Sequence, residues 1–310
     1  MSILFNEDLG STSNRKGLIK LQNKFSGYDP SYVSIASMDT LSGFRKWLEF
    51  VWKQYKPYSD TNFPNEFKKQ FSQRTWELYL GVALLNRGYT LGEHRDVGPD
   101  FKIPLDDKNS VWIEAISVKK GDGQDKVPEI KYGKAIDVPE KEMLLRLTSG
   151  LGEKYQKYLS YLQSNIIKSN DSFVIAIDRS DLQHTDPQIP LIFKCLFAIG
   201  HQVLLINSTK PRPKTEGSNW SSREKVNKMS GNEVPMLLFR NSDFESVSAI
   251  IYCTTNILNS PRNPKYMGNN FVVVHNPFAK NPLPENFIKF GEEWKLEGDQ
   301  LKKIQGVRRS

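Results

Sequence analysis

The chain has 310 residues, of which 38% are hydrophobic, and a formal net charge of +8. This length and apolar content suffice for a hydrophobic core and exclude wholesale disorder. No stretch approaches the ~20 apolar residues of a membrane span, and the first residues contain no signal-type apolar run, so we expect a cytoplasmic protein without a membrane partner. The excess of Lys and Arg permits a polyanionic partner such as DNA but does not require one, because acids are interspersed along most of the chain.

Residues 1–64 are predicted to form an N-terminal helical arm. Its best helix is LSGFRKWLEFVWKQY, residues 41–55, and the turn-rich PYSDTNFPN follows. Four aromatic residues of the arm recur near helical spacing, which favours inward packing over a base-stacking platform: Phe44, Trp47, Trp52 and Tyr55.

A well-packed helix is predicted next, from a cap at Asn65 to a stop at Gly88, because apolar residues between them follow helical spacing. Three strand-like runs follow, YTLGEHR, PDFKIPL and SVWIEAISV, whose turn residues suit an antiparallel meander. A long helix over 140–167, softened around Gly150 and Gly152, then precedes SFVIAID, a strand apolar enough to be covered on both faces.

The remainder repeats the α/β theme, with a helix at 189–200 and strands at 201–207, 247–255 and 271–277. Residues 208–233 are too hydrophilic to pack and are predicted to be a loop, and 297–310 to be a basic tail. Cys195 and Cys253 each lie in an apolar run, which is typical of buried free thiols. The expected organisation is the arm, one α/β domain over 65–296 with a C-terminal elaboration, and the tail.

Three carboxylates occupy suggestive places in this order of elements: Glu77 in the first core helix, Asp100 at the start of the second strand, and Glu114 within the third. An ionised Glu114 among apolar neighbours loses hydration unless it is paired, protonated or metal-bound. Oxygens from adjacent strands suit Mg²⁺. The alternative remains open that Asp100 caps a turn after Gly98 and Pro99, and that Glu114 pairs with a buried Arg or Lys.

The motif strings TWELYLGVALLNRGY, GPDFKI and VWIEAIS resemble those of the PD-(D/E)XK nuclease superfamily over roughly residues 65–180. GPDF and WIEA also resemble strings of an uncharacterised bacterial branch. The resemblance implies a restriction-endonuclease-like αβββαβ core, with a mixed central sheet flanked by helices. It also implies Asp100, Glu114 and Glu77 as ligands of Mg²⁺ or Mn²⁺.

The sequence departs from the family at Ile116, where the family places a catalytic Lys two residues after the strand Glu. Lys154 is the favoured substitute, because it lies on an otherwise apolar stripe of the following helix, and some members resemble this case in taking their base from that helix. The opposing view is that Lys154 only extends past the core towards solvent. Candidate contacts to nucleic acid are Arg146, Lys119, Lys120 and Lys102.

These residues predict a Mg²⁺-dependent endonuclease acting on DNA, with Lys154 orienting water or stabilising charge. Two alternatives remain, a catalytically silent nuclease fold that binds nucleic acid or protein, and an interaction protein that inherited the fold. A zinc site is disfavoured because the four His residues lack ligand spacing. Restriction, defence and repair all stay open as roles, and a dimer is one possible oligomeric state.

Overall fold

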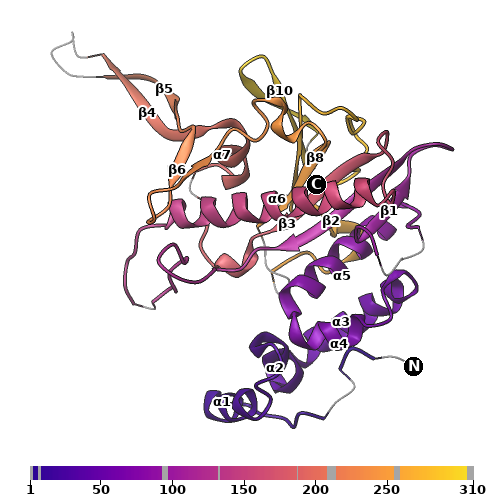
Figure 1. Ribbon diagram of the computed structural model, residues 1–310. Helices are drawn as coiled ribbons and strands as arrows, with labels where there is room; N and C mark the ends of the chain where they lie inside the picture. The colour runs from indigo at the N-terminus through magenta and orange to yellow at the C-terminus, as the bar shows by residue number, and fades with distance from the viewer. Residues whose placement is uncertain are drawn as a thin grey trace.

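The computed structural model describes residues 3–5, 8–92, 97–131, 133–186, 188–207, 214–254 and 259–305. At its centre lies a mixed sheet flanked by helices (Figure 1), as expected, and this sheet has seven strands. In spatial order the strands are β1 (Phe101–Pro104), β2 (Ser110–Ser117), β3 (Ser172–Asp178), β8 (Ala249–Cys253), β9 (Phe271–His275), β10 (Glu292–Glu297) and β11 (Gln300–Gln305). The pairs β2–β3, β3–β8 and β9–β10 are parallel, and the other three are antiparallel.

Helices from the two halves of the sequence cover opposite faces of the sheet. On one side α5 (Phe71–Asn86) packs against β2, α3 (Ser42–Tyr55) and α4 (Phe63–Lys69) pack against α5, and α1 (Arg15–Lys24) and α2 (Pro30–Ser37) lie farther from the sheet. The other side carries α6 (Glu140–Gln163) and α7 (Leu191–Phe197). Short 3₁₀ turns lie at η1 (Asp39–Leu41), η2 (Lys56–Tyr58), η3 (Ser180–Leu182), η4 (Ser242–Phe244) and η5 (Pro264–Tyr266). No helix in the described part of the chain has the length and apolarity to cross a bilayer.

The sheet separates two hydrophobic cores, and side chains of β2 point alternately into one and the other. Ile113 and Ala115 pack into the core that contains α3 and α5, whereas Trp112 and Ile116 pack into the core that contains α6. Because neighbouring side chains on a strand point to opposite faces, Glu114 faces α6.

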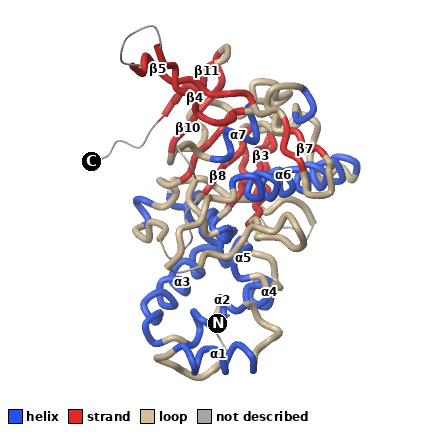
Figure 2. The backbone as a smooth tube through the Cα atoms, turned by 90° about the vertical axis from the view of Figure 1, so that its left-hand side faces the viewer, coloured by secondary structure: helices blue, strands red, loops and turns tan. Residues whose placement is uncertain are grey.

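The N-terminal arm shares its hydrophobic core with the sheet. Phe44, Trp52 and Tyr55 are buried in the same cluster as Ile113, and Trp47 packs against it, so the expected inward packing of these aromatics is confirmed. Figure 2 places these helices at the end of the molecule opposite the hairpin of β4 (Ile199–Asn207) and β5 (Lys214–Ser222).

The helix predicted over 65–88 is wrong at its start. It is divided at Gln70 into α4 and α5, and α4 begins directly after Asn62, so Asn65 lies inside the helix and is not its cap. Pro64 explains the earlier start, since proline lacks an N–H and suits the first helical turn. The predicted end is confirmed, because Gly88 follows α5 with a φ of +82°.

Several other expected boundaries also change. Residues 89–92 form no strand, although Gly92 N donates a hydrogen bond of 2.7 Å to Lys102 O, and 93–95 lie outside the described residues. Within the predicted loop at 208–233, the described part forms β5 and β6 (Lys225–Asn227), and β6 pairs with β7 (Glu233–Pro235). Residues 300–305 of the expected tail form β11, and 306–310 lie outside the description. Both cysteines are free and buried, as predicted.

Candidate active site

The predicted carboxylates line one polar pocket of about 380 Å³ between α5, β2 and α6. Glu77, Asp100, Glu114 and Lys154 all contribute to its wall, although they come from four separate parts of the chain. The structure therefore brings together the residues that sequence reasoning grouped by motif.

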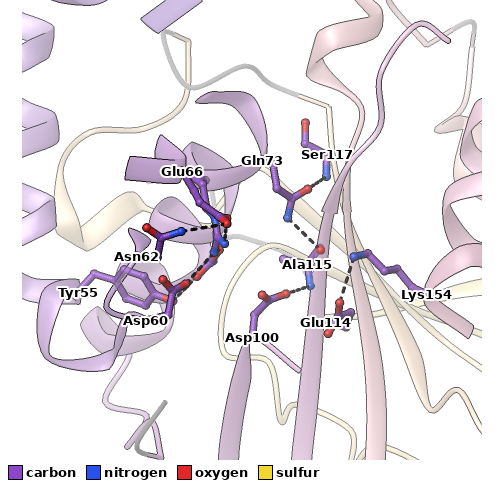
Figure 3. A network of polar contacts seen from close by, with 12 residues as sticks. Tyr55, Asp60, Asn62, Glu66, Gln73, Asp100, Glu114, Ala115, Ser117 and Lys154 are labelled. Atoms are coloured by element: carbon purple, nitrogen blue, oxygen red, sulfur yellow. Dashed lines mark hydrogen bonds and ion pairs between the residues drawn. The ribbon is translucent and has the colours of Figure 1, made fainter. Parts of the chain in front are cut away.

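Glu114 is the most constrained of these side chains, with only 1% of its surface exposed. Its Oε1 accepts hydrogen bonds from Lys154 Nζ at 3.0 Å and from Lys157 Nζ at 2.7 Å, the first of which is drawn in Figure 3. Its Oε2 is buried and has no hydrogen-bond partner. A buried carboxylate oxygen without a partner in the protein is costly, so this oxygen is suited to bind a cation. The alternative that Glu114 pairs with a buried Lys is also confirmed, because Oε1 accepts from the buried Lys154.

Asp100 lies where the pairing of β1 with β2 ends. β1 begins at Phe101, which pairs with Ile113, and among the described residues no strand pairs with this edge of β2 beyond Ile113. Asp100 Oδ2 accepts from Ala115 N at 2.7 Å, and the Gln73 side chain donates to Ala115 O at 3.1 Å (Figure 3). Desolvation, followed by the nearby charges of Glu114 and Glu77, raises the pKa of Asp100 well above its ordinary value.

Glu77 has no exposed surface and both of its oxygens are engaged. Oε1 accepts from the Tyr55 hydroxyl at 2.9 Å, and Oε2 accepts from Arg74 Nη1 at 2.7 Å. Burial raises the pKa of Glu77, although Arg74 and Tyr55 oppose the shift. These contacts are those of a residue that anchors Arg74 beside the pocket.

Close packing of α6 on β2 determines which basic residues reach Glu114. A Cβ placed on Gly150 would lie 2.8 Å from Val118 Cγ1 and 3.3 Å from Ile116 Cδ1. The helix approaches the strand this closely only because residue 150 has no side chain. Ile116 faces α6 with an apolar side chain, and the ammonium group of Lys154, one turn after Gly150, lies 3.0 Å from Glu114 Oε1.

The other predicted basic residues divide into two groups. Arg146 and Lys119 line the pocket, and Arg146 Nε donates to Lys119 O at 2.8 Å. Lys120 instead binds Gln183 Oε1 at 2.8 Å and also Glu129, and Lys102 lies 5.1 Å from the centre of the Trp112 ring. The structure does not bring Lys120 and Lys102 to the pocket wall.

Sequence reasoning missed four residues of the site. Arg74 precedes Glu77 by three positions and Lys157 follows Lys154 by three, which is a spacing that places side chains together on a helix. That signal was available in the sequence. Tyr55 and Gln73 act across tertiary contacts and left no local pattern.

The donor set suits a hard cation better than a soft one. Among the described residues, no group of three or more His, Cys, Asp or Glu side chains is placed to hold a metal. Two carboxylates are nevertheless sufficient for Mg²⁺, which keeps several waters and takes its remaining ligands from phosphate. Asp100 and Oε2 of Glu114 are the candidate oxygen donors of this pocket, whereas both oxygens of Glu77 are already engaged by Tyr55 and Arg74.

No protein-family model matches the sequence, and neither the curated proteins nor the solved structures include a match.

Proposed function

We propose that this protein is a Mg²⁺-dependent endonuclease acting on DNA, built on a restriction-endonuclease-like core of α5, β1, β2, α6 and β3. The observation that carries the proposal is Glu114, a buried carboxylate with one oxygen held by two lysines and the other without a partner in the protein, in the pocket that Asp100 also lines. A phosphodiester is the substrate class that such a site suits, because carboxylates, a hard cation and several Lys and Arg side chains together recognise phosphate.

Asp100 and Glu114 are the proposed ligands, and Mn²⁺ replaces Mg²⁺ readily at such oxygen donors. When bound, the ion supplies a more acidic water and neutralises charge on the phosphate. Lys154 and Lys157 hold the Glu114 carboxylate in position and direct two positive charges towards the pocket. Arg146 and Lys119 lie on the same wall, where they are suited to bind the phosphates on either side of the scissile one.

A second candidate function is DNA binding without cleavage. The two ammonium groups on Glu114 compensate its charge in the absence of any metal, and Ile116 stands where the family has its Lys. A pocket with these properties still attracts a phosphate backbone.

Cleavage of supercoiled plasmid in Mg²⁺ or Mn²⁺ tests the proposal directly. Asp100→Asn and Glu114→Gln preserve shape but remove a charged ligand, and we expect each to lower the cleavage rate by at least ~100-fold, since a metal site contributes several kcal/mol. Asp107→Asn is the matched control, because this carboxylate is exposed in the turn between β1 and β2.

Three results separate the candidates. Cleavage that persists in both site variants would show that Asp100 and Glu114 are not the ligands. DNA binding by wild type without any cleavage would favour the silent fold. The absence of both activities would leave an interaction protein as the better description.

A further inference from the structure

A second cavity of about 280 Å³ lies on the opposite side of α5, between α2, α5 and the end of β3. Three aromatic side chains of α5, Phe71, Trp76 and Tyr79, contribute to its wall. We call it the α2–α5 pocket. Its volume lies just below that of small-molecule sites, which range over roughly 300–1,000 Å³, so it suits a ligand of about one ring system.

The polar groups of this pocket include one that has no partner within the protein. Thr75 is 2% exposed, and its Oγ1 is buried without a hydrogen bond. Ser72 lies one turn earlier on the same face of α5 and donates to the carboxylate of Asp181. A hydroxyl without a partner in the protein and a carboxylate therefore belong to two residues of the same aromatic-lined wall.

The α2–α5 pocket and the candidate active site are neighbours. Ser117 lines the active site, and its hydroxyl donates to Asp178 Oδ2 at 3.0 Å, while Asp178 lines the second pocket. On α5, Gln73 belongs to the first pocket and the adjacent Ser72 to the second. The two pockets therefore share a wall made of α5 and the ends of β2 and β3.

We propose that the α2–α5 pocket binds a single nucleobase that carries an amino group, extruded from the nucleic acid whose backbone enters the active site. The aromatic walls supply stacking, which binds any base. Asp181 accepts from an exocyclic amine, as carboxylates do from cytosine N4, and Thr75 supplies one further hydrogen bond. Adenine, guanine and cytosine fit this description, whereas thymine presents carbonyl oxygens to the carboxylate. The choice of ligand rests on the proposed function, but the pocket itself does not.

Calorimetric titration of the full chain with the four 2′-deoxynucleosides, without divalent metal, tests this inference apart from cleavage. We expect the three amino-bearing nucleosides to bind at least ~5-fold more tightly than thymidine, which is the lower end of discrimination for one good polar pair. Thr75→Val keeps the shape and removes the hydroxyl. It should weaken binding by up to ~10-fold, while the melting temperature stays equal or rises, because an unpaired buried hydroxyl is lost.

Asp181→Asn should weaken binding of the amino-bearing nucleosides by ~10- to 100-fold, the range for a charged hydrogen bond. Thr40→Val and Asp122→Asn are exposed controls outside the pocket and should change nothing. The inference is overturned if wild type binds none of the nucleosides, if all four bind equally, or if both pocket variants bind as wild type does. Plasmid that stays uncut would count against the nuclease proposal alone, since nucleoside binding is measured without turnover.

Discussion

At the scale of single residues, burial of the Asp178 carboxylate should lower the stability of the folded protein at neutral pH, whether or not a ligand is bound. Burial at the end of β3 raises its pKa to about 6 from 3.8, although hydrogen bonds from Ser180 and Ser117 oppose the shift. The folded protein therefore holds this proton more tightly than the unfolded chain does. Stability associated with Asp178 is full below pH 4 and declines as the pH rises towards and through 6.

Asp178→Asn should remove that decline. The interval between 3.8 and about 6 corresponds to ~3 kcal/mol, so the variant should gain up to that amount relative to wild type between pH 4 and pH 7. Urea unfolding at a series of pH values measures the difference. A constant offset between the two proteins across this range would mean that Asp178 does not titrate as described.

The residues of the candidate active site were predictable to different degrees. Glu114 stood out because an acid in an apolar strand needs a partner, and Lys154 because a cation interrupts an apolar stripe. Lys157 escaped notice because its side chain is 45% exposed and falls outside that stripe. A sequence pattern of buried positions therefore identifies Glu114 and Lys154, which are buried, but not Lys157, which is partly exposed.

At the scale of elements, continuous apolar runs were the most reliable signals. All seven residues of β3 are buried, which matches the prediction of a strand covered on both faces. Of the hairpin formed by β4 and β5, the sequence predicted β4 as a strand but placed β5 in a loop. Four consecutive apolar residues of β4 are about half exposed, and β5 is polar, so pairing between the strands forms this element without a core to leave a sequence pattern.

Helix α6 offers a matched test of close packing, because it contains two glycines in different surroundings. Gly150→Ala places a Cβ 2.8 Å from Val118 Cγ1, whereas Gly152→Ala meets nothing within 4 Å. Overpacking costs about 1–3 kcal/mol and the gain in helix propensity offsets ~1 kcal/mol of it. We expect Gly150→Ala to lower the free energy of unfolding by up to ~2 kcal/mol and Gly152→Ala to raise it by ~0.5–1 kcal/mol.

Chemical denaturation of both variants measures these changes against wild type. Equal effects at the two positions would show that α6 is not held against β2 at Gly150. The comparison also bears on the active site, because this close approach brings Lys154 to Glu114.

At the scale of the whole molecule, the sequence predicted which segments form helices and strands better than it predicted which of these segments pack together. The arm and the sheet were expected as separate regions, yet Leu48 and Phe63 share one core with Val174 of β3. Contacts so distant in sequence leave no trace in a local window, which is why Tyr55 of the arm was not expected beside Glu77.

The net charge of +8 makes salt dependence the natural whole-molecule test of a nucleic-acid partner. Each phosphate neutralised by Lys or Arg contributes about −0.9 to the slope of log K against log salt for duplex DNA.

Lys119 is exposed and lines the candidate active site, so Lys119→Ala should reduce the magnitude of the slope by ~1 and weaken binding to all sequences alike. Lys102→Ala is the control, since Lys102 lies over Trp112 away from that pocket. Fluorescence anisotropy with a labelled duplex measures both slopes in Ca²⁺, which blocks turnover in many Mg²⁺ enzymes. An unchanged slope for Lys119→Ala, or an equal loss for Lys102→Ala, would mean that the DNA backbone does not follow the pocket.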